Sequence, residues 1–199
     1  KKMINLNFIF KRVFDILISL FLIITLSPFL LLISLSILLE IKENPIFIQL
    51  RNGKNLKKFK IFKFKTMYKS EDGIKNFTQV KKFDTRVTLI GNFLRKNSID
   101  ELPQIFNVLL GNMSLVGPRP HPIALDKKFE KLIENYNDRY NVLPGITGLA
   151  QVSGFRGETD SIDKMRNRVL CDIKYGENLN LYLDLKIIMK TFLVIFKGV

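Results

Sequence analysis

The sequence predicts an α+β protein, in which an N-terminal membrane helix precedes a small, mainly helical domain with a β-hairpin. Residues 16–39 carry no charged side chain, which indicates a membrane segment. Asn52-Gly53 is a strong turn signal between two runs in which Phe and Ile mix with Lys, and it indicates the hairpin. We expect residues 1–44 to form the membrane anchor and residues 45–199 to form a membrane-associated cytoplasmic domain.

The composition favours an anionic partner at a membrane. Among 199 residues, Lys and Arg number 32 and Asp and Glu 18, so the formal net charge is +14, yet 47% of the residues are hydrophobic. Such a basic excess favours nucleic acid, acidic lipid or a phosphorylated substrate as partner. The single Cys171 and single His121 cannot form an internal disulfide and argue against a Cys/His zinc site. We expect Cys171 to be a buried structural residue.

The apolar run has a Ser27-Pro28 pair near its middle. Proline removes a backbone donor and kinks or breaks a helix. Basic residues flank the run on both sides, which favours two cytoplasmic ends; they are Lys1, Lys2, Lys11 and Arg12 before it, and Lys42, Arg51, Lys54, Lys57 and Lys58 after it. Two forms stay open: a re-entrant helix broken at Ser27-Pro28, with the hydroxyls of Thr25 and Ser27 serving freed backbone groups, or one kinked span.

The remaining segments predict a series of short elements. Residues 46–69 should form the hairpin, with several Lys on one face, and residues 70–86 a loop. Helices are expected at residues 87–97, 100–110, 123–140 and 161–175, and a Gly-rich functional loop at 143–160. The last segment, 181–199, places Lys186, Lys190 and Lys197 near one helix face, which is typical of a helix at a membrane surface or packed on the core.

Adjacent carboxylates, Asp100 and Glu101, stand out in this basic chain. Ser98 and Glu101 match a capping box, which would make Glu101 a structural residue. Pro103 fits better if the helix starts at Asp100, because a missing backbone donor costs little in a first turn. Arg119 stands between two prolines, which make its backbone stiff. An arginine can bind phosphate oxygens through two parallel hydrogen bonds, and a stiff backbone reduces the entropy lost on binding. Together these features indicate phosphate chemistry beside a membrane.

Several long motifs resemble, in order, those of a known family. They are "FKRVFDILISL", "FKIFKFKTM", "DTRVTLIGNFLRKNSIDELPQIFNVLLGNMSLVGPRP", "PGITGLAQVSGFRGET" and "LDLKIIMKT". They resemble the bacterial sugar transferases, the monotopic phosphoglycosyl transferases that start the assembly of capsules, exopolysaccharides and lipopolysaccharide O-antigens. The resemblance implies a re-entrant helix broken at Ser27-Pro28. It also implies transfer of a sugar phosphate from a UDP-sugar to undecaprenyl phosphate, with release of UMP, at the cytoplasmic face of the bacterial inner membrane.

The resemblance also implies roles for individual residues. Asp100 would be the nucleophile that forms an aspartyl-phosphosugar intermediate, and Glu101 would assist the second step or hold the required Mg²⁺ together with Asp100. The phosphates would be neutralised by Arg95, Arg119, Lys63 and Lys65, and the substrate contacted by Gln151 and Arg156. The "RGET" ending at residues 156–159 resembles members that transfer a simple hexose phosphate, glucose or galactose. Leu149 and Phe155 stand where relatives commonly have Trp.

A rival function is a membrane-tethered polyanion binder without catalysis. It explains the net charge and the interleaved Phe and Lys, but it gives no reason for Asp100 and Glu101 inside a basic domain. We therefore expect a UDP-sugar, undecaprenyl phosphate and membrane lipids as partners, Mg²⁺ as cofactor and no nucleic acid. A homodimer is left open.

Overall fold

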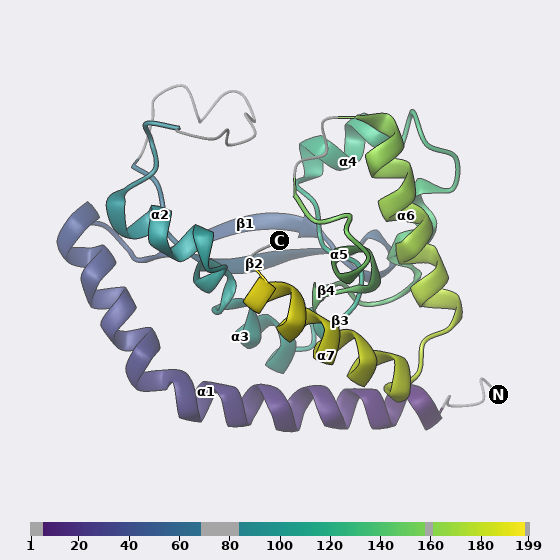
Figure 1. Cartoon of the computed structure of the whole chain (residues 1–199), viewed down its shortest axis with the longest axis horizontal. Coiled ribbons are helices and arrows are strands. Elements are labelled where there is room, and N and C mark those ends of the chain that lie inside the picture. Colours follow the sequence, from purple (N-terminus) through teal and green to yellow (C-terminus); the bar gives the residue numbers. More distant parts are fainter. Residues whose placement is uncertain (1–5, 69–83, 158–160, 198–199) are drawn as a thin grey trace.

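A computed structural model describes residues 6–68, 84–157 and 161–197. One long, bent helix, α1 (Leu6–Ile41), runs along the base and one side of a domain built from short helices and two small sheets (Figure 1). Among the described residues, α1 is the one helix that is long and apolar enough, over Asn7–Ile41, to cross a membrane by length and composition. The mixed content of helix and strand confirms the predicted α+β class.

The bend in α1 is explained by Pro28 and two hydroxyl side chains. Pro28 lies inside the helix and has no N–H to donate to the carbonyl of Ile24, four residues earlier. The Ser27 hydroxyl donates to that carbonyl at 2.9 Å, and the Thr25 hydroxyl donates to the carbonyl of Phe21 at 2.9 Å. The predicted kink is confirmed, and so is the prediction that the Ser27 hydroxyl bonds a freed carbonyl; the Thr25 hydroxyl bonds a carbonyl that Pro28 does not free.

The N-terminal half of α1 is fixed to the domain by three polar side chains. Lys11 pairs with Asp184 at 2.5 Å, and both side chains are buried. Arg12 donates to two carbonyls at the end of α3 (Gln104–Leu109), at 2.7 and 2.9 Å. Asp15 accepts the Leu115 N–H of β3 (Ser114–Val116) at 3.0 Å. These bonds set the position of the apolar helix relative to the domain.

The predicted hairpin is present. Strands β1 (Ile46–Asn52) and β2 (Lys58–Phe64) pair antiparallel, and a 3₁₀ turn, η1 (Lys54–Leu56), joins them. The prediction that several lysines share one face is confirmed for Lys58 and Lys60, which are exposed, whereas Lys63 has the strand spacing of the buried Phe59 and Ile61. Strand β3 pairs in parallel with β4 (Gly145–Thr147), a short sheet that the sequence analysis did not predict.

Most predicted helices are present, with altered boundaries. Helices α2 (Leu89–Lys96), α6 (Ile162–Glu177) and α7 (Leu181–Lys197) match the predicted segments, and α5 (Leu149–Val152) lies within the Gly-rich loop. The single helix predicted over residues 123–140 is wrong. Instead α4 (Ile123–Phe129) is followed by a 3₁₀ helix, η4 (Tyr136–Asn141), after Asn135 takes a left-handed φ of 58°. Most of the predicted loop at 70–86 lies outside the described residues.

The helix predicted over residues 100–110 begins later than expected. Residues Ile99–Glu101 form a 3₁₀ turn, η3, and α3 starts only after Pro103. Ser98 adopts a left-handed φ of 57° and its side chain makes no capping bond, so the capping box is not formed. The two carboxylates therefore lie on a tight turn between α2 and α3.

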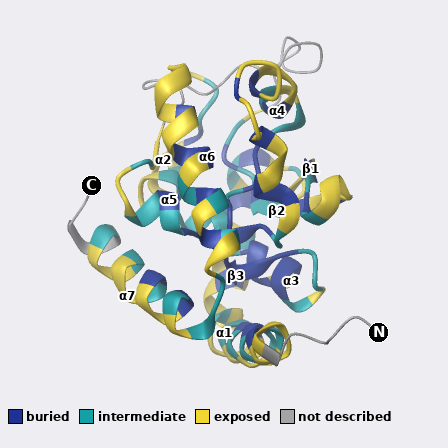
Figure 2. Ribbon diagram, turned by 90° about the vertical axis from the view of Figure 1, so that its right-hand side faces the viewer, coloured by how far each residue is buried: buried dark blue, intermediate teal, exposed yellow. Residues whose placement is uncertain are grey.

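Three apolar clusters hold the elements together. The first joins β2, β3, α3 and the C-terminal helices; the second joins the end of α1 to β2 and α2; the third joins α4, η4 and α6. Buried residues line the interior, while α1 and α7 expose much of their outer surface (Figure 2). Large apolar side chains are exposed on α1 and α7, among them Leu31, Leu39, Met189 and Phe192.

Candidate active site

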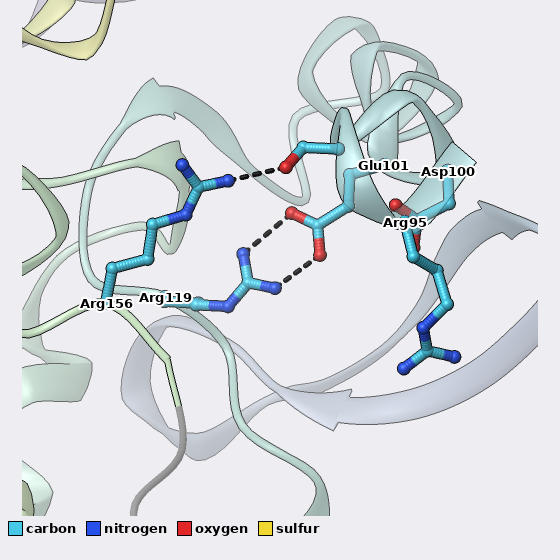
Figure 3. Close-up of a pocket in the computed structure, with 6 residues that line it drawn as sticks. Arg95, Asp100, Glu101, Arg119 and Arg156 are labelled. Carbon is cyan, nitrogen blue, oxygen red and sulfur yellow. Dashed lines mark hydrogen bonds and ion pairs between the residues drawn. The ribbon is translucent and has the colours of Figure 1, made fainter. Parts of the chain in front are cut away.

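The turn that carries Asp100 and Glu101 forms one wall of a polar pocket of about 170 Å³. Arginines from three other segments face it: Arg95 at the end of α2, Arg119 after β3 and Arg156 after α5 (Figure 3). Figure 3 shows Arg119 facing Glu101, with Arg156 on one side and Arg95 and Asp100 on the other. Five of the predicted site residues, Arg95, Asp100, Glu101, Arg119 and Arg156, are thus brought together in space.

Glu101 is fully engaged by two cations. Arg119 donates from Nη1 to Oε2 at 2.7 Å and from Nη2 to Oε1, and Lys63 donates to Oε1 at 2.7 Å. Burial by itself would raise the pKa of Glu101, but the charges and hydrogen bonds of Arg119 and Lys63 outweigh it and hold that pKa well below its usual value. Glu101 is therefore an anion that organises the cations around it.

Asp100 has a different environment from its neighbour. Within the part of the chain that the structure describes, no hydrogen bond or ion pair engages its carboxylate. Burial first, and the charge of Glu101 second, raise its pKa, against the opposing charges of Lys63, Arg95 and Arg119. A carboxylate with no hydrogen bond or ion pair among the described residues, in a pocket lined by arginines, suits a nucleophile that attacks an anionic phosphorus centre.

Two local features place the arginines at the pocket. The Thr88 hydroxyl caps α2 by accepting the Gly91 N–H at 2.9 Å, and the last turn of that helix carries Arg95, whose Nη1 lies 3.2 Å from the Thr66 hydroxyl. Arg156 donates to the Ser98 hydroxyl across the pocket. The sequence analysis treated Ser98 only as a candidate cap, and its place in the pocket was not predicted.

Asn107 is a second residue that the sequence analysis missed. It is buried in α3, donates to the carbonyl of Lys60 at 2.7 Å and accepts the N–H of Phe62 at 2.9 Å. Its side chain thereby continues the hydrogen bonding of β2 and brings Lys63 beside Glu101. A polar residue inside the apolar run "QIFNVLL" was the available signal, since buried polar groups require partners.

Two predicted site residues lie apart from the polar pocket. Lys65 follows the last residue of β2 and forms an ion pair with Glu43, and it is not among the residues that line the pocket. Gln151 lines the neighbouring apolar cleft, and its side-chain amide donates to the carbonyl of Ile146 at 3.2 Å.

An apolar cleft of about 520 Å³ adjoins the polar pocket and shares Ser98, Glu101 and Arg156 with it. Its walls come from α1, α3, α5 and α7 and from the segments around them. The apolar lining includes Phe14, Ile18, Phe21, Leu22, Ile105, Val152, Leu185, Ile188 and Phe192. The combined site therefore has a charged end and a long apolar end beside α1.

Neither the single His nor the single Cys has the properties of a reactive group, although Cys171 is half-buried and not buried as expected. His121 is buried, and burial together with the charges of Arg139 and Arg168 holds its pKa well below the usual value, so it is neutral. Burial and the charge of Asp172 raise the pKa of the Cys171 thiol, which disfavours the nucleophilic thiolate. Among the described residues, no group of three or more His, Cys, Asp or Glu could hold a metal ion.

The chain belongs to the bacterial sugar transferase family, whose profile matches residues 6–198. Over 194 residues it is 47% identical to the UDP-glucose:undecaprenyl-phosphate glucose-1-phosphate transferase of Klebsiella pneumoniae, covering 98% of this chain and 41% of that protein. It is 46% identical over 181 residues to the protein of the same name from Caulobacter vibrioides, covering 91% of this chain and 67% of that protein. It is 42% identical over 189 residues to the exopolysaccharide production protein PSS of Rhizobium leguminosarum bv. phaseoli, covering 94% of each.

These comparisons confirm the family that the motifs indicated. The chain spans about two fifths of the length of the Klebsiella relative and nearly all of the Rhizobium relative.

Proposed function

We propose that this chain transfers a hexose 1-phosphate from a UDP-hexose to undecaprenyl phosphate, as the first step of surface glycan assembly. The observation that carries the proposal is the unpaired carboxylate of Asp100 in an arginine-lined pocket that opens onto an apolar cleft. A water-soluble phosphorylated donor and a lipid phosphate acceptor need such a site, because their phosphates can meet only at the level of the lipid headgroups. UDP-glucose is the first donor to test, since the Klebsiella relative is named for it.

The proposed reaction has two displacement steps. An oxygen of the Asp100 carboxylate attacks the sugar-bearing phosphorus, and the bond from that phosphorus to the bridging oxygen breaks, so UMP leaves with that oxygen. A phosphate oxygen of undecaprenyl phosphate then attacks the same phosphorus, the bond to Asp100 breaks, and the carboxylate is restored. Arg95, Arg119 and Arg156 neutralise the phosphates, and Glu101 keeps Arg119 and Lys63 in position.

The apolar cleft suits the polyprenyl chain of the acceptor. Its lining by α1 and α7 lets an isoprenoid pass from the polar pocket to the exposed apolar surface of these two helices. Glu101 and Arg156 belong to both cavities, so the acceptor phosphate would reach the same arginine as the donor phosphates. This arrangement explains how one nucleophile could serve the two substrates in succession.

Mg²⁺ fits this site as an ion carried largely by the donor's phosphates. Mg²⁺ is commonly bound through one or two carboxylates, substrate phosphates and water. Asp100 offers a carboxylate without a partner, whereas Glu101 would act as a second ligand only after it exchanged Arg119 or Lys63 for the metal ion. The ion would supply further neutralisation of the diphosphate.

We also propose that α1 is re-entrant, with both ends at the cytoplasmic face of the inner membrane and the domain on that face. A straight helix over Leu6–Ile41 would be about 54 Å long, well beyond the ~30 Å hydrocarbon core. The bend at Pro28 and the bonds of Lys11, Arg12 and Asp15 to the domain support an α1 that stays beside the active site. The exposed apolar side chains of α7 support a membrane-surface role for that helix.

The test is a transfer assay with radiolabelled UDP-glucose, Mg²⁺ and undecaprenyl phosphate in detergent or nanodiscs. We expect UMP and a labelled lipid from the wild type and neither from Asp100→Asn, with Asp163→Asn as control because Asp163 is exposed on α6. Enzyme incubated with donor alone should carry a hexose phosphate on Asp100 by mass spectrometry. Full turnover by Asp100→Asn would overturn the nucleophile, and absence of UMP release with every UDP-hexose would favour the polyanion binder.

A further inference from the structure

Two buried arginines behind the pocket hold the backbone that carries Arg119 and Arg156. Arg139, in η4, donates from Nη2 to the carbonyl of Arg119 at 2.7 Å. Arg168, in α6, donates from Nη2 and Nε to the carbonyl of Phe155 at 2.6 and 3.0 Å, and from Nη2 to the carbonyl of Gly157 at 3.1 Å. The two carbonyls held by Arg168 thus belong to Phe155 and Gly157, the residues immediately before and after Arg156. Neither buried arginine lines the pocket itself.

The two buried arginines are linked to each other through α6. Asp172, one turn after Arg168, accepts from Arg139 at 2.7 and 3.1 Å. Neutral His121 stands between them, with Nδ1 2.6 Å from Nη1 of Arg139 and Nε2 3.5 Å from Nη1 of Arg168. Buried charges are costly, and an apolar residue would fill the same volume without that cost. A role in fixing geometry accounts for their presence.

The loop around Arg156 has two other described hydrogen bonds: the Phe155 N–H donates to the carbonyl of Ala150 at 3.0 Å, and the Arg156 side chain donates to Ser98. Gly154 and Gly157 take left-handed φ values of 88° and 108°, and a Cβ built on either would meet no atom within 4 Å. Both glycines therefore have open space where a side chain would stand, and the bonds from Arg168 are the described hydrogen bonds that fix the carbonyls on either side of Arg156. One guanidinium can hold two carbonyls at once, which a single ammonium group on a flexible stem does poorly.

We infer that Arg168 is a positioning residue: it holds Arg156 at the pocket and, through Asp172 and Arg139, fixes the spacing between Arg156 and Arg119. This inference rests on the proposed function, since it assigns the phosphates of the nucleotide-sugar donor to these two arginines. Arg168 makes no contact with substrate in this role and acts only through Arg156. Its contribution should therefore appear in donor binding and depend on the presence of the Arg156 side chain.

The first experiment compares Arg168→Lys with a matched control on the same helix, Arg166→Lys. Arg166 is exposed and pairs only with Asp163 among the described residues. We expect Arg168→Lys to raise the KM for UDP-glucose about tenfold, with kcat within about threefold, because binding is weakened equally before and in the transition state. The control should match the wild type. An unchanged donor KM would overturn the inference.

The second experiment is a double-mutant cycle with Arg156→Ala. If Arg168 acts through Arg156, Arg168→Lys should change the donor KM little once the Arg156 side chain is gone. Additive effects would mean that Arg168 has a general structural role, and would overturn the inference. Should Arg168→Lys fail to fold, Arg168→Gln, which retains two amide N–H donors, serves in the same cycle.

Amide exchange separates this inference from the proposed function. Arg168→Lys should speed exchange over residues 153–157 relative to both the wild type and Arg166→Lys, whether or not the protein turns over a UDP-hexose. A wild type that releases no UMP would refute the proposed function. A catalytically active wild type with unchanged exchange in Arg168→Lys would refute the positioning role alone.

Discussion

Arg119 holds Glu101 with both terminal nitrogens, and the Nη1–Oε2 distance is 2.7 Å. Because Lys63 occupies the same carboxylate, Glu101 links β2, η3 and the segment after β3 into one charged unit. The charge of Glu101, against the effect of burial, raises the pKa of Arg119, so this arginine stays a cation at every accessible pH. Glu101 thus fixes the direction of a permanent positive charge at the pocket.

The two parallel hydrogen bonds of the Arg119 guanidinium should contribute to activity in addition to its positive charge. Arg119→Lys keeps the cation but loses the second parallel bond, and a hydrogen bond to a charged group contributes about 1.5–3 kcal/mol. We expect kcat/KM for UMP release to fall about 10- to 100-fold. Arg166→Lys is the control, since Arg166 is exposed on α6. A variant with wild-type kcat/KM would show that charge alone is sufficient.

The activity should depend on pH through Asp100. Its pKa is raised by burial and by the charge of Glu101, and only the carboxylate form is a nucleophile. As pH falls, Asp100 therefore loses its charge at a higher pH than an ordinary Asp, whose pKa is about 3.9. We expect the acid limb of kcat/KM to lie above that value.

The variant Glu101→Gln tests the cause of this shift. It removes the neighbouring negative charge and leaves Lys63 and Arg119 unpaired, and both changes favour the ionised form of Asp100. The acid limb should move to lower pH even though the maximal rate falls. An acid limb at the wild-type pH would mean that another group titrates there.

The environment that raises the pKa of Asp100, the proposed nucleophile, should also lower the stability of the fold. A carboxyl whose pKa is raised by folding destabilises the fold when it is ionised, so Asp100→Asn should stabilise the inactive protein at neutral pH, by about 0.5–2 kcal/mol. At pH values below the pKa of Asp100 the difference should shrink. Thermal unfolding in detergent measures both effects, with Asp163→Asn as the exposed control. A lower Tm for Asp100→Asn would contradict this account.

Most residues that line the polar pocket could be picked out from the sequence, but their pairing could not. Asp100, Glu101 and Arg119 stand out through their types and their neighbours. That Lys63 would meet Glu101 depends on Asn107 fastening α3 to β2, a contact between segments 45 residues apart. Lys65 shares the strand parity of Lys63, yet it lies beyond the end of β2 and pairs with Glu43. Such contacts follow from packing, which periodicity does not encode.

The secondary-structure elements likewise divide into those with a local sequence signal and those that depend on long-range packing. The long apolar helix and the hairpin have strong local signals, a charge-free run and Asn52-Gly53, and both are present. The pairing of β3 with β4 joins residues from 114 to 147 in strands of three residues each, too short to show alternation. The start of α3 was predicted too early. Ser98 adopts a left-handed conformation and is followed by a 3₁₀ turn, and residues other than glycine rarely adopt that conformation, so the sequence did not indicate it.

The junction of β3 and β4 should be intolerant of side chains. A Cβ on Gly145 would lie 2.0 Å from the backbone nitrogen of Gly117, so Gly145→Ala must push the strands apart close to Arg119. We expect a loss of about 1–3 kcal/mol in the free energy of unfolding. Gly176→Ala is the matched control. Gly176 lies within α6, and a Cβ there would meet the side chain of Val142 at an ordinary contact distance of 3.5 Å. Because alanine favours a helix more than glycine does, this substitution should stabilise the protein by about 0.5–1 kcal/mol. Equal effects of the two substitutions would contradict the close approach.

The bend at Pro28 should decide which side of the membrane the start of α1 occupies. With the native Cys171 replaced by Ala, a single cysteine at the exposed position Phe10 can report accessibility to a membrane-impermeant maleimide. In intact cells we expect no labelling of the re-entrant form, and labelling after permeabilisation. Pro28→Ala combined with Ser27→Ala restores an N–H donor to the Ile24 carbonyl and removes the competing hydroxyl, so the straighter helix should place a fraction of the N-termini outside. Labelling of the parent in intact cells would show instead that α1 spans the membrane.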